Sequence, residues 1–180
     1  MEVPEYKMVE VPGYKIFNGD MTNWYGLQFE EGRTYHTIRK PGFYYCTKLS
    51  EVFGVYFGNP SVQVARVTGY IEEEREASFR KYSTTVRTAV SLRIDKILTR
   101  EEIMQQVIAD GESSIKDYLR YFPVTTEEED YFVENYGDNE ELMEIIAYNR
   151  RKAAEKGKPK TREKTGYVYR PFKKEKKEKR

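Results

Sequence analysis

The chain has 180 residues, of which 38% are apolar and 34% charged, so it can form one domain with a hydrophobic core but leaves little room for a second catalytic domain. One cysteine and one histidine exclude an intramolecular disulfide and a zinc site built from Cys and His ligands. The formal net charge of +1 conceals a division: residues 150–180 contain 15 Lys and Arg against 4 Asp and Glu, whereas residues 1–149 contain 16 against 26.

The same composition predicts where the protein resides. No stretch of about 18 consecutive apolar residues is present, so we expect neither a membrane span nor a secretion signal. A lone cysteine, Cys46, fits a reducing compartment. We therefore expect an intracellular protein.

The first part of the chain predicts short strands joined by tight turns. After an extended lead-in over residues 1–12, alternating side chains predict a strand at 14–17. Two further short strands are expected at 24–29 and 33–38, each closed by a turn that contains glycine. Such a series is typical of an antiparallel sheet.

A Pro-Gly step at Pro41 precedes the most aromatic segment. Residues 43–47 predict a fourth strand, and the apolar residues that follow recur at the spacing of one helix face. These residues are Leu49, Val52, Phe53, Tyr56 and Phe57.

Two more strands are expected. Residues 62–68 predict the first, and residues 91–98 predict the second, because they alternate apolar and charged side chains within a β-branched region that begins at Thr84. Residues 72–75 form a charged stretch between them, which we expect to be an exposed loop.

After Leu98 the pattern becomes helical. We expect four helices, begun by Thr99 with Glu102, by Ser113 or Ser114, by Thr125 with Glu128, and by Asp138 with Glu141. The predicted fold class is α+β: a mainly antiparallel sheet with one packed helix in residues 1–98, a helical extension in 99–157, and a basic tail in 158–180. Because the tail has almost no aliphatic residues, we expect it to be disordered.

Five segments of the N-terminal half form a recognisable series: Tyr-Lys-Ile-Phe at 14–17, Tyr-Gly-Leu-Gln-Phe-Glu-Glu-Gly at 25–32, Gly-Phe-Tyr-Tyr-Cys-Thr at 42–47, Val-Gln-Val-Ala-Arg-Val at 62–67 and Arg-Ile-Asp-Lys-Ile-Leu at 93–98. In these segments the chain resembles an uncharacterised small α+β domain of phages and large DNA viruses, which sometimes precedes viral ankyrin repeats. The resemblance implies a viral protein that acts in the cytoplasm or nucleus of the host cell or in the virion. It implies no particular reaction, and residues after 98 show no ankyrin period.

Residues 42–47 are also similar to the glycine-led strand that leads into a helix beside the nicotinamide pocket of ADP-ribosyltransferase-like folds. That similarity implies NAD as cofactor and a pocket formed by His36, Tyr44 or Tyr45, and a glutamate such as Glu72. The residues around His36 and Cys46 do not by themselves indicate a catalytic site. No carboxylate lies near His36 in sequence to orient it, and Cys46 in an aromatic strand is typical of a small apolar core residue.

The basic tail is the best sequence candidate for a binding site. Its short aromatic and cationic segments predict salt-sensitive, sequence-independent contacts with nucleic acid, lost on deletion of residues 158–180, although an acidic protein partner or a merely solubilising terminus fits the same charge. The candidate residues are Tyr167, Tyr169, Arg170, Lys173, Lys174, Lys176 and Lys177.

Two functional hypotheses follow. The first is a non-enzymatic viral accessory or interaction protein, without cofactor or metal, whose tail contacts nucleic acid or an acidic partner. The second is a divergent ADP-ribosyltransferase-like enzyme that uses NAD. The second hypothesis requires His36, the Tyr44 and Tyr45 pair and a glutamate to line one concave pocket.

Overall fold

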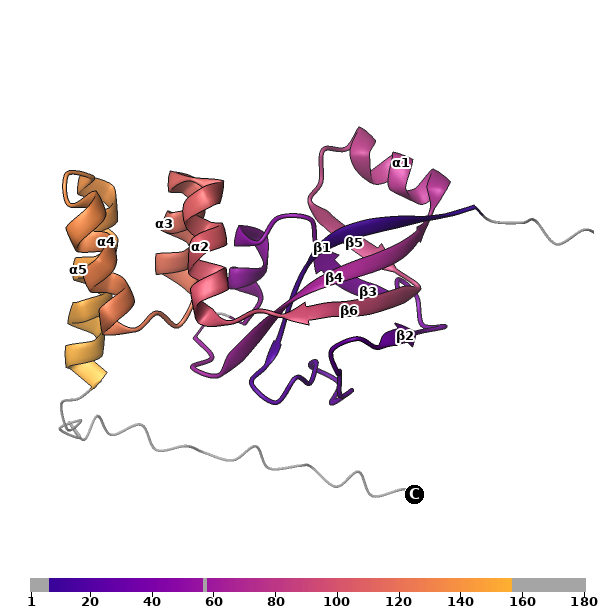
Figure 1. The fold of residues 1–180 in the computed structure, drawn as a ribbon, viewed down its shortest axis with the longest axis horizontal. Helices are drawn as coiled ribbons and strands as arrows, with labels where there is room; N and C mark the ends of the chain where they lie inside the picture. Colours follow the sequence, from indigo (N-terminus) through magenta and orange to yellow (C-terminus); the bar gives the residue numbers. More distant parts are fainter. Residues whose placement is uncertain (1–6, 57, 157–180) are drawn as a thin grey trace, which may run out of the picture.

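Six antiparallel strands form one sheet in the order β2-β6-β4-β1-β3-β5 in the computed structural model, which describes residues 7–56 and 58–156 (Figure 1). The strands are β1 (Met8–Asn18), β2 (Thr34–His36), β3 (Phe43–Cys46), β4 (Val62–Glu72), β5 (Val86–Ala89) and β6 (Ser91–Ile97). The helices are η1 (Ser50–Tyr56), α1 (Glu73–Lys81), α2 (Arg100–Asp110), α3 (Glu112–Tyr121), α4 (Thr126–Tyr136) and α5 (Glu140–Lys156). The expected α+β class is confirmed.

Strands β1 and β4 form the centre of the sheet. They pair along their whole length, from Met8 opposite Glu72 to Asn18 opposite Val62, whereas β3 pairs with β1 only at Tyr14 and Cys46. The side chain of Tyr45 in β3 reaches back to β1, where its hydroxyl donates to the carbonyl of Val11 at 3.1 Å.

Glycine makes that contact possible. A Cβ on Gly69 of β4 would lie 2.5 Å from a ring carbon of Tyr45, well inside van der Waals contact. Because Gly69 has no side chain, the Tyr45 ring can lie against β4.

Phe29 is the centre of one hydrophobic core. Its ring lies 4.9 Å from that of Phe17, 4.7 Å from that of Tyr35 and 6.0 Å from that of Phe43. Together with Val67, Leu92 and Ile94, these rings join the irregular segment after β1 to the sheet.

A second core joins the sheet to the helices. Ile16 of β1 and Val64 of β4 belong to the same buried cluster as Phe53 of η1 and residues of α2 to α5. The ring of Phe53 lies 5.5 Å from Tyr118 and 5.2 Å from Phe122. Figure 1 shows α2 to α5 beside one end of the sheet, with η1 between α3 and the strands.

Several local expectations are confirmed. The capping boxes of Thr99 with Glu102 and of Thr125 with Glu128 begin α2 and α4. The expected helix after β3 is the 3-10 helix η1, and four residues of its predicted face are buried: Leu49, Val52, Phe53 and Tyr56. Phe57 lies outside the described residues.

Other expectations were wrong. Residues 24–29 form no strand and contribute only a bridge between Thr22 and Gln28. The N-cap of α3 is Gly111, with a φ of 93°, rather than Ser113 or Ser114. At α5, the side chain of Asn139 accepts from the Leu142 amide at 3.1 Å, a capping contact that we expected from Asp138.

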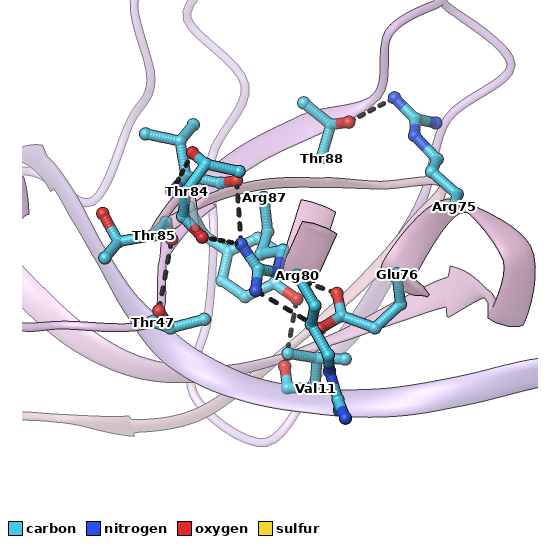
Figure 2. A network of polar contacts seen from close by, with 11 residues as sticks. Val11, Thr47, Arg75, Glu76, Arg80, Thr84, Thr85, Arg87 and Thr88 are labelled. Atoms are coloured by element: carbon cyan, nitrogen blue, oxygen red, sulfur yellow. Dashed lines mark hydrogen bonds and ion pairs between the residues drawn. The ribbon is translucent and has the colours of Figure 1, made fainter. Parts of the chain in front are cut away.

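The expected exposed loop at 72–75 was also wrong, because α1 begins there and a buried ion pair holds it. Glu76 accepts from Nε of Arg87 at 2.8 Å and from a terminal nitrogen at 3.3 Å, and the exposed Arg80 approaches the same carboxylate at 3.0 Å. Figure 2 shows this network between α1 and β5, with Arg75 reaching Thr88 beside it. A charged segment thus becomes helical because its carboxylate meets an arginine 11 residues later.

Candidate functional site

A cleft of about 900 Å³ opens beside β3 and is the strongest candidate site in the described part of the chain. It is bordered by β1, by residues 23–27, by the connection from β2 into β3, and by η1. The lining residues that bear on function are Lys15, Trp24, Tyr25, Leu27, His36, Arg39, Lys40, Tyr44, Tyr45, Cys46, Glu51, Val55 and Tyr56.

A side-chain-capped turn places two aromatic rings at one side of the cleft. Oδ1 of Asn23 accepts from the amides of Tyr25 at 2.9 Å and Leu27 at 3.0 Å, and Gly26 adopts a φ of 75°. The indole of Trp24 stacks on Tyr56 of η1 at 4.8 Å with planes 6° apart, yet Trp24 is 70% exposed. One face of the indole is therefore open to a ligand.

The opposite wall is fixed by its neighbours in the fold. The Thr37 amide donates to the Val90 carbonyl at 2.9 Å, and Arg75 of α1 donates to the Pro41 carbonyl at 3.0 Å. A Cβ on Gly42, which has a φ of 110°, would lie 2.5 Å from the Ala89 carbonyl oxygen. These contacts hold Arg39 and Lys40 at the edge of the cleft.

Lys15 supplies a cation from the central strand. Its Nζ donates to the Tyr44 carbonyl at 2.6 Å and lies 5.5 Å from the centre of the Phe17 ring. Burial lowers the pKa of Lys15 to about 8. The neighbouring Cys46 thiol has its pKa raised to about 11 by burial, so it stays protonated and is a poor nucleophile at neutral pH.

The cleft brings together three of the four residues expected for a nicotinamide pocket. His36, Tyr44 and Tyr45 all line it. His36 is exposed, with Nδ1 2.7 Å from the Ser91 hydroxyl, and Tyr44 is 55% exposed. Tyr45 is only 2% exposed, and its hydroxyl is bonded to Val11, so its ring belongs to the core.

The fourth expected residue does not join them. Glu72 lies opposite Met8 at the end of β4, where it precedes α1, and it is not among the residues that line the cleft. The carboxylate that does line it is Glu51 of η1. The candidate tail residues, from Tyr167 to Lys177, lie outside the described residues.

Sequence reasoning missed the rings and cations that give the cleft its character. The sequence pattern predicts a strand for Trp24 and Tyr25 and another for Lys15, and it assigns no binding role to Lys15, Arg39 or Lys40. The available signal was the Asn23 to Gly26 spacing, which is typical of a turn and forces the two aromatic residues within it to the surface.

The described range, residues 7–56 and 58–156, holds no group of three or more His, Cys, Asp or Glu side chains arranged to bind a metal ion. None of its helices combines the length and the apolar character that a membrane crossing requires.

Comparison with known proteins gives no further guide to the site. Neither a protein-family model, nor a curated protein, nor a solved structure matches the chain.

Proposed function

We propose that the protein is a non-enzymatic interaction protein that binds single-stranded nucleic acid, with an unpaired base stacked in the cleft. The observation that carries this proposal is the exposure of Trp24, Tyr25 and Tyr44 around one concavity. A folded protein gains little from exposing adjacent rings, whereas each base that stacks on such a ring contributes about 1–3 kcal/mol.

The charge at the cleft supports the same ligand. Lys15, Arg39 and Lys40 line it against the single carboxylate of Glu51. This local excess of cations occurs in a region, residues 1–149, that contains 16 Lys and Arg against 26 Asp and Glu. Rings beside cations are the usual means by which proteins hold bases and phosphates of a single strand.

The basic tail completes the proposal. Its lysines and arginines would add phosphate contacts that do not depend on sequence, while the cleft would distinguish unpaired from paired bases. An accessory role in a virus-infected cell, in cytoplasm or nucleus, stays a prediction of the resemblance noted above.

The intrinsic fluorescence of Trp24 offers a direct test, because it is the only tryptophan of the chain. An oligodeoxycytidine of about 12 nucleotides should quench its emission, whereas a duplex of equal length should quench it far less. Tyr44→Ala should weaken binding about tenfold. Tyr82→Ala is the matched control, since Tyr82 is 73% exposed and lies outside the cleft.

The proposal fails if single strand and duplex quench Trp24 equally, or if Tyr44→Ala and Tyr82→Ala bind with the affinity of the unaltered chain. The first result would show that the cleft does not select unpaired bases, and the second that Tyr44 does not hold a base.

An NAD-using transferase is the second candidate, favoured by the presence of His36 and Tyr44 in one cleft. Its test is release of nicotinamide from NAD by the full chain. The nucleic-acid proposal predicts no release. Release that is lost in His36→Ala and retained in Tyr82→Ala would favour the enzyme instead.

A further inference from the structure

We infer that Lys15 is the residue that binds the ligand's phosphate in the cleft and that it makes this binding decline in alkaline solution. The inference deepens the proposed function and rests on it. Arg39 and Lys40 lie on the connection between β2 and β3, whereas Lys15 belongs to the central strand of the sheet.

The position of Lys15 is fixed. Its strand pairs with β4 from end to end, its Nζ donates to the Tyr44 carbonyl at 2.6 Å, and the Phe17 ring lies 5.5 Å away. Within the described residues, the Tyr44 carbonyl is the one hydrogen-bond acceptor that Nζ reaches. An ammonium group has three N–H donors, so two are available to phosphate oxygens.

Lys15 also contacts a residue whose aromatic ring lines the cleft. Tyr44 contributes both the carbonyl that holds Lys15 and an exposed ring that lines the cleft. We therefore place the phosphate of a base stacked on that ring at the Lys15 ammonium, since the ring and the ammonium belong to the same cleft.

The alkaline decline follows from the position of the amine, which is partly buried between the Phe17 ring and the Tyr44 carbonyl, where the loss of surrounding water lowers the pKa of Lys15 to about 8. Below that pH the ammonium form attracts phosphate, and above it the neutral amine does not. Bound phosphate favours the charged form and shifts the decline to somewhat higher pH. Exposed lysines, by contrast, ordinarily titrate near ~10.4.

Other charged and titratable groups line the cleft with Lys15. Cys46 of β3 has a pKa raised to about 11, so its thiol is neutral throughout the relevant range. Glu51 of η1 and, on the wall after β2, Arg39 and Lys40 complete the charged set, with His36 and Tyr44 nearby.

The experiment measures the affinity of the full-length chain for oligodeoxycytidine, by fluorescence anisotropy, from about pH 7 to about pH 9.5. Cytosine and the phosphodiester do not titrate in this range. The affinity of the unaltered chain should fall about tenfold as pH rises. Lys15→Met should bind weakly at every pH, and Lys15→Arg should bind well at every pH, because guanidinium keeps its charge.

Lys48→Met is the control, since Lys48 is exposed and does not line the cleft. It should keep the affinity and the pH profile of the unaltered chain. An oligonucleotide with uncharged methylphosphonate linkages should bind with no decline above about pH 8.

The inference is overturned if Lys15→Met keeps the unaltered pH profile, or if the uncharged oligonucleotide shows the same decline. If Trp24 is still quenched in that case, the proposed function stands without Lys15. If no oligonucleotide quenches Trp24 at any pH, the proposed function and the role of Lys15 fail together.

Discussion

The charged segment after β4 folds as α1 and is joined to β5 by a buried ion pair. Glu76 and Arg87 are both almost fully buried, and two hydrogen bonds join their side chains (Figure 2). A buried carboxylate that loses its partner keeps its desolvation cost without compensation. The pair therefore fixes α1 on β5, and α1 in turn holds the cleft wall through Arg75 and Pro41.

We predict that Arg87→Met lowers the free energy of unfolding by about 3 kcal/mol, because it leaves Glu76 buried and without its bidentate partner. The matched control is Arg80→Met, which removes a second arginine from the same carboxylate. The Arg80 side chain is 74% exposed, so its loss should cost less than about 1 kcal/mol. Urea denaturation measures both, and equal losses would contradict this account of α1.

At the scale of elements, η1 connects the helices to the cleft. Its Phe53 packs against the stacked rings of Tyr118 and Phe122 in the helical half, while its Tyr56 stacks on Trp24 at the cleft. One short helix thus contacts both the helical half and the cleft. The helical half supports the position of the ring on which Trp24 rests.

Phe53→Ala should destabilise the chain by about 4 kcal/mol, because it leaves a cavity in the buried core beside the rings of Tyr118 and Phe122. Val55→Ala in the same helix is the control. Val55 is half exposed at the cleft, so its truncation should change the free energy of unfolding by less than about 0.5 kcal/mol. Thermal or urea unfolding compares the two, and a similar cost for both would show that η1 does not join the cores.

The elements that could be predicted from sequence are those determined by neighbouring residues. The capping boxes at Thr99 and Thr125 and the buried face of η1 depend on contacts within one or two turns. The elements that were missed depend on distant partners. α1 requires Arg87 to accommodate Glu76, and β1 begins at Met8 because β4 pairs with it along 11 residues.

The candidate site was predicted only in part, because several of its residues are brought together by partners that are distant in sequence. The similarity of residues 42–47 to a strand of ADP-ribosyltransferase-like folds suggested that Tyr44 borders a pocket with His36, and both residues do line the cleft. Glu72 could not be placed from sequence, since β4 continues four residues past Thr68 and carries it away from the cleft. The pairing of Lys15 with the Tyr44 carbonyl spans 29 residues and left no local signal.

At the scale of the whole molecule, the distribution of charge separates two contributions to binding. The acidic region of residues 1–149 repels a polyanion except at the cleft, whereas residues 150–180 hold 15 Lys and Arg against 4 Asp and Glu. We therefore attribute long-range attraction to the tail and selection of unpaired bases to the cleft.

Deletion of residues 158–180 should reduce affinity for single strands and make it much less dependent on salt, because fewer counterions are released. It should leave folding unchanged, since the two hydrophobic cores of residues 7–56 and 58–156 are built from side chains that the deletion retains. Preference for single strand over duplex should persist in the shortened chain. Anisotropy titrations at several salt concentrations measure this, and loss of the preference together with the tail would place selection outside the cleft.

The most direct measurement is photocrosslinking of the full chain to a single-stranded oligonucleotide that carries one 5-iodouracil, with the attachment sites read by peptide mass spectrometry. Bases stacked in the cleft should crosslink to Trp24, Tyr25 or Tyr44, and free oligodeoxycytidine should compete them away. Crosslinks confined to residues 158–180, or found equally at Tyr82, would contradict the proposal that the cleft holds the base.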